Sequence, residues 1–144
     1  MAGNNIILEV QNLTKYFDTP KGKLHAVDSV SFKLKKGTTL GIVGESGCGK
    51  STTARTILKL IEPTSGRIIF DGEDITDYGP RKMRKIRTEM QIIFQDPFSS
   101  LDPRQSVMQL SSEPIREHKI CHSKEEIEKR TLELMDTVGL ARRF

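Results

Sequence analysis

The chain has 144 residues, 35% of them hydrophobic and 29% charged, which is enough for a globular protein with a hydrophobic core. This composition excludes a low-complexity protein, and two cysteines exclude a disulfide framework. Without an apolar run long enough to cross a bilayer or a recognisable signal peptide, we expect a soluble protein of a reducing, cytoplasmic compartment.

The N-terminal third alternates apolar and polar residues, which predicts antiparallel strands. Residues 6–13 and 30–35 each place apolar side chains on one face at a spacing of two. Residues 14–17 are expected to end the first strand, and 18–22 to form a turn or a small insertion.

Residues 44–51 read Gly-Glu-Ser-Gly-Cys-Gly-Lys-Ser, the pattern of a phosphate-binding P-loop. Residues 39–43 predict a short buried strand before it, and 52–61 a helix after it. Glycines let the backbone amides approach and surround phosphate oxygens, and the start of a helix adds free amides and a positive dipole end. We expect Lys50 to reach the β- and γ-phosphates and Ser51 to ligate Mg²⁺. A glycine-rich turn without a ligand is the alternative, and the flanking elements favour the P-loop.

Strands and a helix alternate after the P-loop. Residues 62–66 form a turn, 67–70 a strand, and 90–94 a buried strand. The basic residues 80–87 predict a short helix whose charged face is solvated. Binding to nucleic acid or to an acidic membrane is the alternative, and nucleic acid is disfavoured because no aromatic residues are interleaved.

The C-terminal part predicts helices. One covers residues 106–113 and is limited by Pro114. Ser123 and Glu126 form a capping box before the next helix, and Gly139 is its predicted C-cap. We therefore divide the chain into an α/β lobe at 1–97 and a helical part at 98–144.

Three runs together resemble the ATP-binding subunits of ABC transporters, and most closely the oligopeptide, dipeptide or nickel importer type. They are the P-loop at 44–51, Glu-Pro-Thr-Ser-Gly at 62–66, and Ile-Phe-Gln-Asp-Pro-Phe-Ser-Ser-Leu-Asp-Pro-Arg at 93–104. The resemblance implies an α/β P-loop NTPase fold that has antiparallel N-terminal strands and the start of a helical subdomain. One small departure is Asp102, where many relatives carry Asn.

The resemblance also implies roles for single residues. Gln95 matches the glutamine that coordinates Mg²⁺ or orients the attacking water, and it joins Ser51 as a predicted metal ligand. Phe17, or else Tyr16, matches the aromatic residue that stacks on adenine, unless it packs in the core. The residues predicted to hold the nucleotide are Phe17, Gly44, Glu45, Ser46, Gly47, Cys48, Gly49, Lys50, Ser51 and Thr52.

Several motifs of the resembled family are absent from the sequence. We find no Leu-Ser-Gly-Gly-Gln signature, no Walker B strand followed by a catalytic glutamate, and no switch histidine. Asp71 and Asp96 follow apolar runs but come too early, so they are assigned to a turn and to the glutamine loop. The resemblance therefore implies the N-terminal part of a nucleotide-binding domain, cut at Phe144, that binds ATP and Mg²⁺ and hydrolyses ATP negligibly by itself.

For the parent protein, the resemblance implies an ATPase that powers peptide import. It would work on the cytoplasmic face of the cell membrane, with permease subunits and a second ATP-binding subunit, and without nucleic acid. The alternatives are a non-catalytic nucleotide-binding fragment and a non-transport ABC-type ATPase. A GTPase is disfavoured because no Asn-Lys-x-Asp motif occurs, and a small-molecule kinase because no arginine-rich lid is found.

Overall fold

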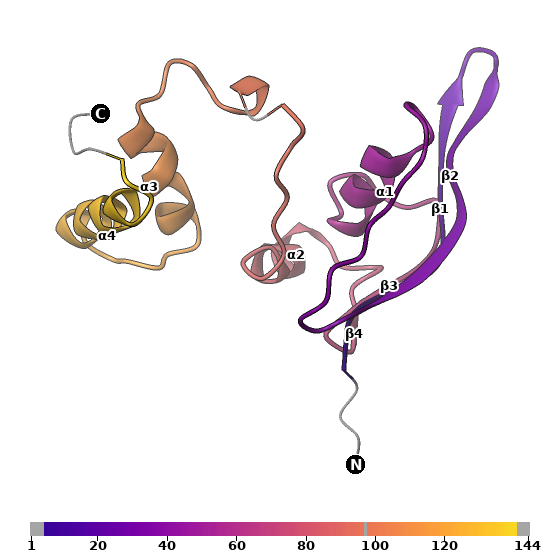
Figure 1. Cartoon of the computed structure of the whole chain (residues 1–144), viewed down its shortest axis with the longest axis horizontal. Helices are drawn as coiled ribbons and strands as arrows, with labels where there is room; N and C mark the ends of the chain where they lie inside the picture. The colour runs from indigo at the N-terminus through magenta and orange to yellow at the C-terminus, as the bar shows by residue number, and fades with distance from the viewer. Residues whose placement is uncertain (1–4, 97, 141–144) are drawn as a thin grey trace. The chain divides into compact units, whose positions relative to one another are not determined.

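The N-terminal part of the chain is built on a long β-hairpin. In this computed structural model, which describes residues 5–96 and 98–140, β1 (Ile6–Thr19) and β2 (Gly22–Lys35) pair antiparallel (Figure 1). The strands continue through the segments predicted to end the first strand and to separate it from the second. Only Pro20 and Lys21 form the turn between them.

The hairpin belongs to a four-stranded sheet in the order β2-β1-β3-β4, in which β3 is Ser65–Phe70 and β4 is Glu73–Asp74. Every pairing among the described strands is antiparallel. Asn12 adopts a positive φ of 47° where the register of β1 shifts, and the Ser31 hydroxyl accepts its backbone N–H at 2.7 Å. The bulge therefore keeps a polar partner for the backbone donor that leaves the ladder.

Two helices cover this sheet. The helix after the P-loop, α1, spans Lys50–Ile57, and α2 spans Pro80–Ile86, which confirms the predicted basic helix. The core joins apolar side chains of β1, β3, both helices and the residue that follows β4: Val10, Leu13, Ile57, Ile68, Phe70, Ile75, Met83 and Ile86. The α/β class is thus confirmed, and α1 lies against the hairpin that precedes the P-loop (Figure 1).

Two predicted strands were wrong. Residues 39–43 and 90–94 have no strand structure, and Val43 and Ile93 each leave 93% of their surface exposed. An apolar run forms a buried strand only when neighbouring strands bond its amides and another layer covers its side chains. Among the described residues the sheet ends at β2 and β4, and neither apolar segment joins it.

The helix α1 ends earlier than its apolar spacing predicted, at a left-handed residue. Lys59 has φ of 53°, and the amides of Lys59 and Leu60 bond the Thr56 and Arg55 carbonyls at 3.0 and 2.9 Å. The Lys59 side chain is 4% exposed. Its ammonium group donates to the Glu62 carboxylate and, at 2.6 Å, to the Thr76 carbonyl. A lysine can be buried here because both contacts replace water.

The C-terminal part contains a short 3₁₀ turn, Phe98–Ser100, and the helices α3 (Val107–Glu117) and α4 (Lys124–Thr137). The helix α3 passes through Pro114, so its predicted end was wrong. Ser106 and Gln109 form a capping box at its start, and backbone bonding resumes with the His118 amide donating to the Pro114 carbonyl at 3.0 Å.

The predicted caps of α4 are confirmed. Ser123 and Glu126 form the capping box. Gly139, at φ of 75°, and Leu140 donate to the Asp136 and Met135 carbonyls at 3.1 and 2.9 Å, the bonding pattern of a Schellman motif. Backbone bonds from the His122 and Ser123 amides lower the pKa of the Glu126 carboxyl group.

The chain forms two compact units, Met1–Met90 and Gln91–Phe144. This division falls before the boundary predicted between residues 97 and 98, and it places the Gln95 segment with the helices. None of the described helices is both long and apolar enough to cross a membrane.

Candidate functional site

The predicted phosphate-binding loop leads directly into α1. Gly49 is the N-cap residue of the helix, and its carbonyl accepts both the backbone N–H of Thr53 at 2.8 Å and the Thr53 hydroxyl at 2.9 Å. Thr53 is 5% exposed, so its side chain locks the first turn from the buried face of the helix. No acidic residue occupies this turn, which leaves the positive end of the helix dipole uncompensated by the helix itself.

The loop is fixed against β2 at one close contact. Gly49 has φ of 93°, and a Cβ atom built on it would lie 2.0 Å from the Ala26 carbonyl oxygen. A side chain is therefore excluded by conformation and by space together. Gly47, at φ of 81°, needs the left-handed conformation but has open space around it. Glycine is therefore required at position 49 by both conformation and space, and at position 47 by conformation alone.

The Lys50 side chain turns back into the loop. Its ammonium group donates to the Gly44 and Glu45 carbonyls at 2.8 and 2.5 Å, and it lies 3.5 Å from the Cys48 sulfur. These three contacts use all three donors of the ammonium group, so a phosphate oxygen would take the place of one of them, and the weak bond to sulfur is the one most easily exchanged. The loop and the predicted phosphate-binding cation are therefore brought together.

The remaining predicted loop residues leave their side chains accessible. Glu45, Ser46, Cys48 and Ser51 are exposed, and Thr52 is half-buried. The Ser51 hydroxyl, predicted to ligate Mg²⁺, is thus free to be reached from solvent at the start of α1. Sequence reasoning missed Thr53 and Ala26, which support the loop from behind, because their roles depend on the contact between α1 and β2.

The hairpin separates the two candidate adenine-stacking residues. The Tyr16 ring stacks on His25 with ring centres 3.8 Å apart, and its hydroxyl donates to the Asp28 carboxylate at 2.7 Å. This bond raises the pKa of the Tyr16 phenol. Phe17 is half-buried and lies under the Lys15 ammonium group, 4.9 Å from the ring centre. One face of each ring is therefore already covered, that of Tyr16 by His25 and that of Phe17 by the Lys15 ammonium group, and the choice of Phe17 for a base stays a prediction.

The strand register does not decide between the two aromatic residues. Residues opposite each other in a ladder lie on the same face, and residues two apart along a strand share that face. Lys15 is paired with Val27, whose side chain lies 3.9 Å from the position that a Cβ atom on Gly49 would take. The register shifts between Lys15 and Tyr16, however, so that Tyr16 lies opposite His25 and Phe17 opposite Leu24, and the alternation of faces does not carry past Lys15.

Gln95 is exposed and lies in the other compact unit, Gln91–Phe144. The next residue, Asp96, organises the turn that follows, since its carboxylate accepts the Ser99 amide at 3.3 Å and its carbonyl accepts the Ser100 hydroxyl at 3.0 Å. Asp96 is thus occupied in the loop, in line with its sequence assignment. The metal-binding role of Gln95 stays a prediction.

Comparison with known proteins identifies relatives along the chain. The family described as "ABC transporter" matches residues 27–143. The oligopeptide transport ATP-binding protein OppF of Bacillus subtilis is 47% identical over 93% of this chain and 44% of its own length. The glutathione import ATP-binding protein GsiA of Pectobacterium atrosepticum is 45% identical over 96% of this chain and 24% of its own length. The chain therefore spans less than half of these curated relatives.

Solved structures show the same fold. The dimeric structure of MJ0796, a bacterial ABC transporter cassette, superimposes with a TM-score of 0.78 at 30% identity, over 95% of this chain and 59% of that one. The cbiO1 protein of Clostridium perfringens, described as part of the cbiONQ transporter complex, gives a TM-score of 0.70 at 31% identity, over 95% and 52% of the two chains.

Proposed function

Because this chain belongs to the ABC transporter family, we propose that it binds ATP with Mg²⁺ through residues 44–51. The observation that carries the proposal is that the loop directly before the helix α1 holds the Lys50 ammonium group on its own carbonyls. Because Gly49 has no Cβ, the loop can pass close to β2. For the same reason its backbone can approach an anion closely at the start of the helix. These residues fit the phosphates of a nucleotide.

The proposed roles follow from the chemistry of each group. Lys50 neutralises phosphate charge and Ser51 offers a hydroxyl to Mg²⁺, which itself offsets the charge of the nucleotide phosphates. Phe17 stacks on adenine beside the loop. Gln95 supplies a neutral carboxamide to the metal or to water. The other predicted loop residues contribute backbone amides rather than side chains.

Titration of the 144-residue chain with a fluorescent ATP analogue tests this proposal. Replacing Lys50 with Ala removes charge-assisted hydrogen bonds worth about 1.5–3 kcal/mol, so affinity should fall by about 10- to 100-fold. The control is Lys129→Ala, which removes the same charge from an exposed position on α4. Equal affinity of wild type and Lys50→Ala would refute the assigned loop.

Hydrolysis is measured separately because it needs groups that the sequence does not contain. Attack of water on the γ-phosphate is catalysed mainly by positioning and charge neutralisation. The chain offers Lys50, Ser51 and Gln95 but no glutamate base or signature motif. We expect ATP binding without appreciable turnover. Steady-state phosphate release that Lys50→Ala abolishes would contradict this.

For the whole protein we propose an ATPase that drives peptide import. The support is the named function of relatives that are 45–47% identical, an oligopeptide transport protein and a glutathione import protein. The proposed partners are permease subunits and a second ATP-binding subunit at the cytoplasmic face of the membrane. Peptide uptake by vesicles holding the assembled transporter should stop with Lys50→Ala and persist with Lys129→Ala. A non-catalytic nucleotide-binding role is the second candidate, and uptake unaffected by either variant would favour it.

A further inference from the structure

Lys15 is a half-buried cation of the β-hairpin to which the proposed function gives no role. Its ammonium group lies over the face of the Phe17 ring, 4.9 Å from the ring centre. Among the described residues, it forms no ion pair and no side-chain hydrogen bond. A half-buried lysine ordinarily keeps its charge on a carboxylate or in water. Lys15 instead lies on the ring that is predicted to stack on a base, in a cation–π contact.

The strand pairing places Lys15 beside the start of α1. Lys15 lies opposite Val27 in the ladder of β1 and β2, and residues directly opposite each other share a face of the sheet. Val27 is 3% exposed, and one of its methyl groups lies 3.9 Å from the position that a Cβ atom on Gly49 would take. Gly49 is the N-cap residue of α1. The face of the hairpin that carries Lys15 therefore meets the P-loop at this point.

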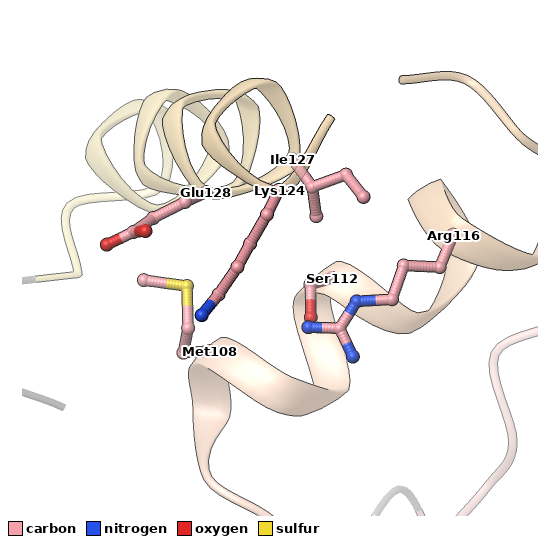
Figure 2. A pocket seen from close by; sticks show the side chains of 6 residues that line it. All are labelled: Met108, Ser112, Arg116, Lys124, Ile127 and Glu128. Atoms are coloured by element: carbon pink, nitrogen blue, oxygen red, sulfur yellow. The ribbon is translucent and has the colours of Figure 1, made fainter. Parts of the chain in front are cut away.

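Cations without an ion pair also occur far along the chain, in a different setting. Figure 2 shows Arg116 of α3 and Lys124 of α4 at a pocket of about 480 Å³ between these helices. Neither forms an ion pair within the part of the chain that the structure describes. That pocket belongs to the compact unit Gln91–Phe144, whereas Lys15 and the P-loop both belong to Met1–Met90. Of these three cations, Lys15 is therefore the one whose contacts connect it to the nucleotide residues.

A bound nucleotide would change the surroundings of the Lys15 ammonium group. A base that stacks on the covered face of the Phe17 ring takes the place of the ammonium group, and the flexible lysine stem lets that group turn to a new acceptor. Asp28, a carboxylate on the neighbouring strand, already accepts the Tyr16 hydroxyl at 2.7 Å. Lys50 is assigned to the β- and γ-phosphates, so the phosphate next to the ribose is the anion left without a lysine.

From these contacts we propose that Lys15 moves from the Phe17 ring to the α-phosphate when a nucleotide binds. The inference rests on the proposed binding of ATP at residues 44–51 and adds a contact that this loop does not supply. A charge-assisted bond to a phosphate oxygen is stronger than the cation–π contact that it replaces. The two lysines then divide the phosphate chain, with Lys50 on the β- and γ-phosphates and Lys15 on the α-phosphate. A nucleotide with one phosphate therefore gains from Lys15 and little from Lys50.

A second arrangement would leave the Lys15 ammonium group where it is. A base stacked on the opposite face of the Phe17 ring keeps the cation–π contact, and the lysine then acts on the base only through the ring. Adenosine and AMP carry the same base, so this arrangement gives them the same benefit. A ligand series that differs only in the number of phosphates therefore separates the two arrangements.

The test is competition of adenosine, AMP, ADP and ATP against the fluorescent ATP analogue on the 144-residue chain. In the wild type, AMP should compete about tenfold better than adenosine, because one charge-assisted bond is worth about that factor. Lys15→Met keeps an unbranched stem and removes the charge. It should weaken AMP, ADP and ATP about tenfold each and leave adenosine within about twofold. Lys50→Ala should instead weaken ATP much more than AMP.

Two further variants separate charge from packing. Lys15→Arg keeps the charge and should bind AMP within about threefold of the wild type. Lys35→Met removes the same charge from an exposed position opposite Ile6, at the other end of the hairpin, and should leave every affinity unchanged.

Four results would overturn the contact between Lys15 and the α-phosphate. They are equal competition by AMP and adenosine in the wild type, an AMP affinity that Lys15→Met leaves unchanged, equal weakening of adenosine and AMP by Lys15→Met, and no recovery with Lys15→Arg. The variant Lys50→Ala distinguishes this failure from failure of the nucleotide assignment. If Lys50→Ala weakens ATP and Lys15→Met does not, the P-loop assignment holds and the Lys15 contact is wrong. If neither variant weakens ATP, both are wrong.

Discussion

Replacing Gly49 with Ala gives a sharp test of how the P-loop is held. Two costs add at this position. A left-handed conformation at φ of 93° costs a residue with a Cβ about 1–2 kcal/mol. The new methyl group would also lie 2.0 Å from the Ala26 carbonyl oxygen, and forcing atoms into packed space costs about 1–3 kcal/mol. We therefore expect a loss of about 2–5 kcal/mol in the free energy of unfolding.

The matched control is Gly37→Ala. Gly37 also has a positive φ, 71°, but nothing lies within 4 Å of the position that its Cβ would take, so only the conformational cost of about 1–2 kcal/mol remains. Urea unfolding gives the stability of both variants, and titration with the fluorescent ATP analogue gives their affinity. Gly49→Ala should weaken nucleotide binding because the loop must move away from β2. Equal destabilisation by the two variants, together with wild-type affinity for Gly49→Ala, would refute the contact between the loop and the strand.

Three further predictions concern the hairpin, the sheet and the C-terminal helix. Phe17→Ala should weaken ATP binding by about 1–3 kcal/mol, the worth of stacking on a base, while Tyr16→Ala should change it little; the same ATP titration decides, and the reverse order would assign the base to Tyr16. Lys59→Met should cost about 1–3 kcal/mol in urea unfolding because a buried carbonyl loses its donor, whereas Lys129→Met should be near neutral. Because the pKa of Glu126 is lowered in the folded chain, its carboxylate stabilises α4 fully above pH 4.5, and this stabilisation is lost as pH falls through the folded pKa. Circular dichroism should therefore show loss of helix below pH 4.5. The variant Glu126→Gln, which is uncharged at every pH, should not show this loss.

Local signals were sufficient for the elements whose ends are set by their own residues. The capping boxes and the glycine after α4 depend on bonds between residues a few positions apart, and the Ser123–Glu126 box and Gly139 were predicted correctly. The matching capping box at Ser106 and Gln109, at the start of α3, was not predicted. The predicted end of the same helix was wrong. Pro114 indicated a helix end, but α3 keeps bonding on both sides of it.

Contacts between distant segments could not be predicted from the sequence as well as the helix caps. Apolar runs at 39–43 and 90–94 predicted buried strands, yet a strand exists only where a neighbour accepts its hydrogen bonds and a layer covers its side chains. The burial of Lys59 was also invisible, because its partners Glu62 and Thr76 meet it only after α1 packs on the sheet. A charged residue in a sequence gives no indication of a buried partner.

The sequence by itself was sufficient to predict a phosphate-binding loop and to identify the family, because the Gly-Lys-Ser spacing and the Gln-Asp-Pro segment are linear patterns tied to local backbone chemistry. Tertiary structure decided that the Tyr16 ring stacks on His25, why Gly49 admits no side chain, and that the Lys59 ammonium group meets the Thr76 carbonyl. Each of these depends on a contact between segments distant in the chain, and such contacts arise only when the core has packed.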